Sequence, residues 1–232
     1  MERRKLLGTL AAGTLGLGLV GRIPQSASPA PAAPQDPQGD YKVRSFNVEA
    51  GLPGLSKALI EEHLGLYKGY VNRSNALLKD LLAAEKEART SPATQETRRR
   101  LGFEFSGMRL HELYFEALRE KGAGPGVNHP LQAAIRATWG SHDAWWAAFK
   151  TTCTMTGIGW GALVQDPATG RLMNVWMQDH ENAIAVGTTP ILVVDVWEHA
   201  YVKDYGAAGR GKYVDAIRPL IDWGVVEKRF HS

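Results

Sequence analysis

Residues 195–201 read Asp-Val-Trp-Glu-His-Ala-Tyr, and they directly follow the run Pro-Ile-Leu-Val-Val at positions 190–194. This run is short and rich in β-branched residues, which predicts a buried strand. Asp195 and His199 stand four residues apart where the strand ends, so their side chains can converge on one point. Carboxylate and imidazole groups are both good ligands for first-row metals. Alone, however, a pair with this spacing is a weak signal, because most such pairs are solvated.

The longer string is a far more specific signal than the pair. Letter for letter, residues 195–201 resemble the signature of the iron/manganese superoxide dismutase family. This resemblance implies that Asp195 and His199 are two of four protein ligands to one metal ion. It also implies two ligand histidines upstream, each on its own helix, and a Gln-Asp pair before the strand.

Two upstream histidines meet this expectation. His63 lies seven residues before Tyr70, which begins Tyr-Val-Asn (70–72), and His111 is followed by Glu-Leu-Tyr-Phe (112–115). Both contexts are similar to those of the family's helical ligands. Three imidazoles and one carboxylate suit manganese or iron. The resemblance therefore implies superoxide as the substrate and a single manganese or iron ion with four ligands: His63, His111, Asp195 and His199.

The residues expected around the metal are also recognisable. Residues 177–179 (Met-Gln-Asp) resemble the family's Asn-Gln-Asp, whose glutamine hydrogen-bonds the metal-bound solvent, and Tyr70 resembles the tyrosine that orients this network. Tyr70 and Gln178 are therefore the expected catalytic residues. Gly107 lies four residues before His111, on the same helix face. A small residue there, with a glutamine from the strand, resembles many manganese forms, so manganese is slightly favoured over iron.

Other aromatic and charged residues would complete the site. Trp160 and Trp197 would wall it, and Arg210 resembles the arginine of the family's substrate funnel. Glu198 resembles the glutamate that reaches the metal-bound histidine of a partner subunit, which implies a homodimer through this region. The remaining histidines are expected on the surface: His129, His142, His180 and His231. A place near the site is left open for His180, because it follows Gln-Asp.

The chain departs from the family in the helix that carries His63. The family usually has a spacing of eight between this ligand and the tyrosine, whereas here it is seven. Seven steps of about 100° return almost to the same face, so a regular helix places Tyr70 beside His63. Leu-Tyr-Lys (66–68) stands where the family has two histidines, and Val202 replaces a tyrosine after His199. In active dimers of the family that tyrosine hydrogen-bonds one of the histidines across the interface, and the pair forms a gateway at the mouth of the substrate funnel. Because this gateway pair is missing, the alternative function is a non-catalytic metal-binding or partner-binding protein.

The composition is that of a globular protein with an export signal. Hydrophobic residues make up 44% of the 232 residues and charged residues 22%, which is ordinary for a folded domain. Residues 1–33 begin Met-Glu-Arg-Arg-Lys, continue with a Gly/Ala/Leu-rich run and then become Pro/Ala/Ser-rich. This pattern is typical of a twin-arginine signal for export to the periplasm or the cell exterior. An uncleaved anchor or a misplaced start is the alternative.

The charge and the cysteine count exclude several function classes. The formal net charge is +3, but residues 1–33 contain four cationic residues and one anionic residue, which leaves 23 of each in the remainder. This neutral remainder does not suggest a nucleic-acid partner, and no stable membrane association is expected after cleavage. Cys153 is the only cysteine, so an intrachain disulfide is excluded and a buried apolar role is expected.

Hydrophobic periodicity predicts two long helices, followed by shorter helices and strands. Ser56 is the expected N-cap of the first, and a Gly/Pro cluster follows the second. Pro219 is expected to kink or shorten the last helix. The helices are expected at about 56–88, 93–121, 131–139, 142–152 and 212–223, and the strands at 160–165, 171–177 and 189–194.

This order predicts an α+β fold, with an N-terminal helical hairpin followed by a mixed α/β unit with a three-stranded antiparallel sheet. The expected domains are the export signal and start of the linker at 1–33, the linker at 34–41, the helical-hairpin domain at 42–124 and the α/β domain at 125–232.

Overall fold

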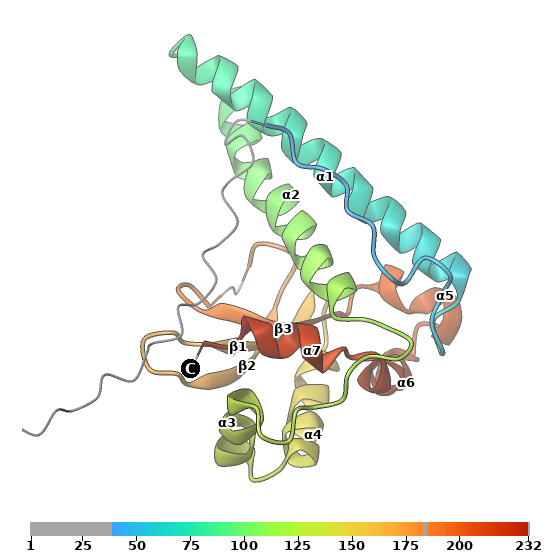
Figure 1. Cartoon of the computed structure of the whole chain (residues 1–232). Coiled ribbons are helices and arrows are strands. Elements are labelled where there is room, and N and C mark those ends of the chain that lie inside the picture. The colour runs from blue at the N-terminus through green and yellow to red at the C-terminus, as the bar shows by residue number, and fades with distance from the viewer. Residues whose placement is uncertain (1–38, 183–184, 232) are drawn as a thin grey trace, which may run out of the picture. The chain divides into compact units, whose positions relative to one another are not determined.

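The computed structural model describes residues 39–182 and 185–231 (Figure 1). Asp40–Ser232 form one compact unit. The expected export signal at 1–33 and the linker up to residue 38 lie outside the described residues, and the expected domain boundary after residue 124 stays a prediction. Among the helices of the described ranges, none has the length and apolar character needed to span a bilayer.

Helices α1 (Lys57–Lys86) and α2 (Pro92–Glu116) form the predicted hairpin (Figure 1). Each helix begins at a serine whose side chain accepts a hydrogen bond from a backbone N–H three residues later. Ser56 accepts from Leu59, and Ser91 accepts from Thr94. Helix α1 is α-helical throughout its length, which puts Tyr70 on the buried face with His63, as expected.

The sheet has the strand order β2-β1-β3, with both pairs antiparallel. Its strands are β1 (Trp160–Gln165), β2 (Leu172–Met177) and β3 (Thr189–Asp195). Every residue of the central strand β1 is buried. In this register Trp160 pairs with Met177 on one side and with Asp195 on the other. The first residue of β1 and the last residues of β2 and β3 therefore meet at one end of the sheet.

Helix α2 packs against β3, and helix α4 packs against β1 and β2. Helix α4 (His142–Cys153) follows α3 (Pro130–Trp139), and the two lie on the far side of the sheet from the hairpin (Figure 1). After β3 the chain forms a set of short helices. They are the 3-10 turn Glu198–Ala200, α5 (Val202–Tyr205), α6 (Arg210–Ile217), the 3-10 turn Arg218–Leu220, α7 (Trp223–Val226) and the 3-10 turn Glu227–Arg229.

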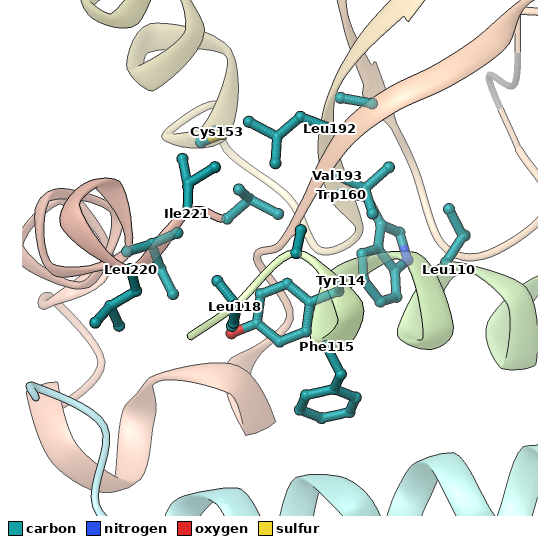
Figure 2. Close-up of a cluster of buried hydrophobic side chains, with 14 of the residues drawn as sticks. Leu110, Tyr114, Phe115, Leu118, Cys153, Trp160, Leu192, Val193, Leu220 and Ile221 are labelled. Carbon is teal, nitrogen blue, oxygen red and sulfur yellow. The ribbon is translucent and has the colours of Figure 1, made fainter. Parts of the chain in front are cut away.

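The core joins the hairpin to the sheet and to the C-terminal segment (Figure 2). Its members are all buried, and Tyr114, Phe115 and Trp160 are among the largest side chains that are fully enclosed. Cys153 is buried among them, as expected. The residues labelled in this cluster are Leu110, Tyr114, Phe115, Leu118, Cys153, Trp160, Leu192, Val193, Leu220 and Ile221.

The predicted α+β class is confirmed, and two helix ends differ from the expectation. Helix α2 was expected to continue to Lys121 but ends at Glu116. The following residues pair instead with the C-terminal segment, because Arg119 N–H donates to the carbonyl of Leu220 and Asp222 N–H donates to that of Ala117. The helix that was expected to run to Trp223 is α6, and it ends at Ile217, two residues before Pro219, a shortening of the kind expected from the missing N–H.

Candidate metal centre

Four side chains with metal-ligating groups converge where the hairpin meets the end of the sheet. His63 comes from α1 and His111 from α2, whereas Asp195 ends β3 and His199 lies in the 3-10 turn that follows. Their ligand atoms all lie within 4.8 Å of one another. His63, His111 and Asp195 are fully buried, and the side chain of His199 is 23% exposed. All four predicted ligands are therefore brought together.

One carboxylate oxygen is the centre of this group. Oδ2 of Asp195 lies 3.1 Å from Nε2 of His63, 3.2 Å from Nε2 of His199 and 3.7 Å from Nε2 of His111. The other oxygen, Oδ1, accepts a hydrogen bond from the backbone N–H of Trp197 at 2.8 Å. The hydroxyl of Tyr213 donates to the backbone carbonyl of Asp195. The carboxylate is thus fixed with one oxygen directed at the three histidines.

The ring of His111 shows which of its nitrogens is available. Its Nδ1 lies 2.6 Å from the carbonyl oxygen of Gly107, so Nδ1 carries the proton and donates it. Nε2 therefore presents a lone pair to the group. Within the described part of the chain this buried Nε2 has no hydrogen-bond partner. A buried polar atom without a partner is costly, and a metal ion at this point would satisfy it.

Electrostatics favours the protonation states that metal binding requires at three of the four ligands, and His199 is the exception. Burial lowers the pKa of His63 and of His111, so both rings are neutral. Burial alone would raise the pKa of Asp195, but the charge of His199 and the hydrogen bonds with His199 and His63 hold it well below its usual range. Burial alone would lower the pKa of His199, but the Asp195 carboxylate raises it. Neutral imidazoles and an ionised carboxylate are the forms that ligate metals, so His63, His111 and Asp195 are in the required form, whereas a metal ion competes with a proton for His199.

Beside the four ligands lies a chain of three hydrogen-bonded side chains. The indole N–H of Trp160 donates to Nδ1 of His180 at 3.0 Å, and Nε2 of His180 lies 2.7 Å from the hydroxyl of Tyr70. Because Nδ1 accepts from Trp160, the proton of the neutral His180 ring is on Nε2, which donates to the Tyr70 oxygen. The hydroxyl proton of Tyr70 is then free to donate elsewhere. The ring of Tyr70 lies 5.0 Å from that of His111.

His180 was expected on the surface, with a place near the site left open because it follows Gln-Asp; the surface expectation is wrong, since the residue is fully buried. Gln178, which was expected to supply the hydrogen bond at this place, is instead exposed and is not brought to the ligands. The backbone explains why His180 and not Gln178 points inward, since Asp179, two residues after the end of β2 at Met177, has a φ of 57°. Asp tolerates this left-handed conformation. The resulting turn directs His180 inward, and a Gln-Asp-His string after a strand is the one signal that could have indicated it.

The other expected residues around the site are placed as follows. Trp160 lies against His111, and Trp197 is stacked on His199 with 5.9 Å between ring centroids. Arg210 donates to the carbonyl of Met155. The remaining histidines are outside the group: His129 caps α3 and is half-buried, His142 is half-buried against Trp145 and Trp223, and His231 is exposed.

Of the substituted gateway positions, Tyr67 has new hydrogen-bond partners. Tyr67, in the interval where the family has histidines, is buried, accepts from the backbone N–H of Arg44 and donates to Glu112. Leu66 is 39% exposed, and Val202 is half-buried. The side chain of Glu198 is exposed next to His199.

Comparisons with known proteins agree with this geometry. Residues 127–229 match the family model of iron/manganese superoxide dismutases, C-terminal domain. The chain is 37% identical over 196 residues to an iron superoxide dismutase of Cupriavidus metallidurans, an alignment that covers 82% of this chain and 96% of that protein. It is 32% identical over 188 residues to manganese superoxide dismutase 2 of Haloferax volcanii, covering 81% and 92% of the two chains. An iron superoxide dismutase of Tetrahymena pyriformis is 35% identical over 187 residues, covering 77% and 93%. With the ligand geometry and these relatives together, the chain belongs to the iron/manganese superoxide dismutase family.

Proposed function

We propose that the chain is a superoxide dismutase with one manganese or iron ion held by His63, His111, Asp195 and His199. The observation that carries the proposal is the convergence of three imidazole Nε2 atoms on one buried carboxylate oxygen. This donor set suits both metals. The earlier preference for manganese depended on Gly107 together with Gln178, and only Gly107 borders the site, so the proposal covers either metal.

The overall reaction converts two superoxide anions and two protons into O2 and H2O2. A bound manganese or iron ion supplies the one-electron exchange that this reaction needs. The protein supplies a rigid donor set and an aromatic enclosure, formed by Trp160 and Trp197 beside the ligands. Superoxide carries one negative charge, and the site holds a single carboxylate among three imidazoles, so its donor set does not repel an anion strongly.

Tyr70 is the residue best placed to deliver a proton. Burial raises its pKa to about 12, so the hydroxyl keeps its proton at neutral pH. Burial also lowers the pKa of His180 to about 4, so this ring stays neutral and keeps donating to the Tyr70 oxygen. Accepting from His180 orients the Tyr70 hydroxyl and leaves its own proton for a reacting oxygen in the site. We assign Tyr70 as the proton donor and His180 as the residue that orients it.

The test is the metal content of the purified protein, followed by superoxide removal by manganese-loaded and iron-loaded samples. Near-stoichiometric metal with fast turnover in one form is the expected result, and it names the metal. His111→Ala should lose both the metal and the activity, because it removes the one ligand nitrogen that has no other partner. Full metal with negligible turnover in both forms would contradict the proposal. That outcome would favour a metal-binding protein without catalysis, in which the substitutions at Leu66, Tyr67 and Val202 have removed the entrance for substrate.

We further propose a homodimer through the region of Glu198 and export through the twin-arginine pattern of residues 1–33. Glu198 is exposed and directly precedes the partly exposed ligand His199, which supports a role for this face at an interface. Sedimentation of wild type and Glu198→Ala tests the dimer, which the variant should weaken. Fractionation of cells with N-terminal sequencing tests export, and a cytosolic protein with an intact N-terminus would contradict it.

A further inference from the structure

Helix α2 carries a buried carboxylate that the metal ligands do not explain. Glu104 lies seven residues before His111, and its side chain is 0% exposed. Its Oε2 accepts from Nε of Arg73, on α1, at 2.7 Å. Its Oε1 accepts from Nε of Arg100 at 2.8 Å, with a second nitrogen of Arg100 at 2.7 Å. We refer to these three residues as the Arg73–Glu104–Arg100 cluster.

The two arginines of this cluster lie over aromatic rings of the site. The guanidinium carbon of Arg73 is 4.9 Å from the ring centroid of Tyr70, and that of Arg100 is 4.3 Å from the ring centroid of Phe103. The rings of Tyr70 and Phe103 in turn lie 4.8 Å and 4.6 Å from the ring of His180. Through its two arginines, Glu104 therefore holds two of the rings that contact His180.

The backbone leaves room for this arrangement. A Cβ on Gly69 would lie 2.8 Å from Nη1 of Arg73. Because Gly69 has no side chain, the guanidinium of Arg73 can pack against helix α1, where it covers the Tyr70 ring and donates to Glu104. The side chains of Arg73 and Arg100 remain 51% and 44% exposed, so solvent reaches the outer side of the cluster.

Stability alone does not account for the cluster. Burying a carboxylate costs several kcal/mol of solvation, and a buried ion pair is often no more stabilising than apolar residues of the same volume. Such a pair does fix geometry, because the guanidinium groups of Arg73 and Arg100, on two helices, donate to the same buried carboxylate. The cluster covers Tyr70 directly and reaches His180 through Phe103, and the mutual orientation of Tyr70 and His180 decides where the Tyr70 proton points.

We propose that Glu104 is a positioning residue for dismutation, which keeps the side chains of Tyr70 and His180 in their mutual orientation through Arg73 and Arg100. This inference rests on the proposed function and adds a residue that touches neither ligand nor substrate. The proposal predicts the direction in which turnover changes when Glu104 is substituted. Glu104→Gln removes a negative charge and leaves two cations near the site, so attraction of an anion would by itself increase. Loss of positioning instead decreases turnover.

The experiment compares four variants in the metal-loaded, full-length protein. Glu104→Gln and Arg73→Met disconnect the cluster, Arg73→Lys keeps the charge with a single donor group, and Glu96→Gln is the matched control. Glu96 pairs with Arg99 on the same helix but is exposed. The readouts are metal content, kcat and KM for superoxide, the affinity for azide from the visible absorption of the bound metal, and near-ultraviolet circular dichroism.

Glu104→Gln and Arg73→Met should keep their metal and lose roughly tenfold in kcat without a rise in KM, since small misplacements of a reacting group cost this much. Azide should bind no more weakly than to wild type, Arg73→Lys should recover part of the loss, and Glu96→Gln should match wild type. Unchanged or increased kcat in metal-loaded Glu104→Gln would overturn the proposal.

The two proposals fail in different ways. If metal-loaded wild type itself is inactive, the proposed function fails, and the circular dichroism still tests the positioning role. An aromatic signal altered in Glu104→Gln but not in Glu96→Gln would then support it, and an unaltered signal would overturn it.

Discussion

Gly107 lies so close to Tyr70 that helix α2 has no room for a side chain at this position: a Cβ would be 2.8 Å from Cδ1 of the Tyr70 ring and 3.1 Å from Cδ2 of His180. Both rings are enclosed parts of the site, so neither can move aside freely. Gly107→Ala should separate Tyr70 from His180. We expect turnover to fall by roughly tenfold and the free energy of unfolding to fall by about 1–3 kcal/mol from overpacking.

The control for this substitution is Gly65→Ala, on α1. A Cβ there meets nothing within 4 Å, so the variant should keep its turnover and gain up to about 1 kcal/mol from helix propensity. Superoxide assays and urea unfolding measure both quantities. If Gly107→Ala changed turnover and stability no more than Gly65→Ala does, the close packing at Gly107 would not matter for catalysis.

Substitutions at His180 and Gln178 should have unequal effects. His180→Ala leaves the indole N–H of Trp160 and the hydroxyl of Tyr70 without their shared partner, which costs about 1–3 kcal/mol for each buried group left unsatisfied. Turnover should fall with it. Gln178→Ala, at an exposed position, should change neither quantity. His180→Gln keeps a donor and an acceptor at this point and should fall between the two. The reverse order would return the catalytic role to Gln178.

Metal affinity should fall on acidification in two stages. Asp195 raises the pKa of His199 in the metal-free chain, so this ligand takes up a proton first, and log affinity should fall with a slope of about one proton near neutral pH. Burial lowers the pKa of His63 and His111, so they stay neutral until the pH is below the ordinary histidine value of about 6.5, where the slope should steepen. Equilibrium dialysis at several pH values measures this. An affinity that is constant down to about pH 5 would contradict the assignment of imidazole ligands.

Cys153 should be unreactive in the folded protein. Burial raises the pKa of its thiol, and the thiolate is the reactive form. Its Sγ also lies against Gly161, where a Cβ would be only 2.3 Å away. A thiol reagent should label the native protein only as slowly as it unfolds, and should label it at once in denaturant. Rapid labelling of the native protein would show that α4 opens away from β1.

Most elements were predictable because they are marked by local patterns, whereas the four ligands were predicted from the resemblance of their sequence contexts to those of the family. Ser56 caps α1 as its type predicts, and the strand before Asp195 is a continuous apolar run. The end of α2 was missed, because Arg119 follows a helix-forming sequence and leaves the helix only to pair with Leu220, far along the chain. Such a pairing has no local signal.

The second layer of the site was predicted less well for the same physical reason. Strand alternation from Met177 does not say that Asp179 adopts a left-handed conformation, and that one dihedral angle decides between Gln178 and His180. Glu104 likewise resembles any helix-surface glutamate with an arginine four residues before it. Its burial depends on the packing of α1 against α2, which sequence periodicity does not specify.

The separation of the ligands over the chain has a consequence for biosynthesis. His63 is on α1, His111 on α2, and Asp195 and His199 follow β3, so an unfolded or half-folded chain offers only the last two as neighbours. Two ligands hold an ion far more weakly than four, so copies with an undocked hairpin would lose it. Chains whose hairpin has not docked would therefore add to the metal-free fraction of a fresh preparation.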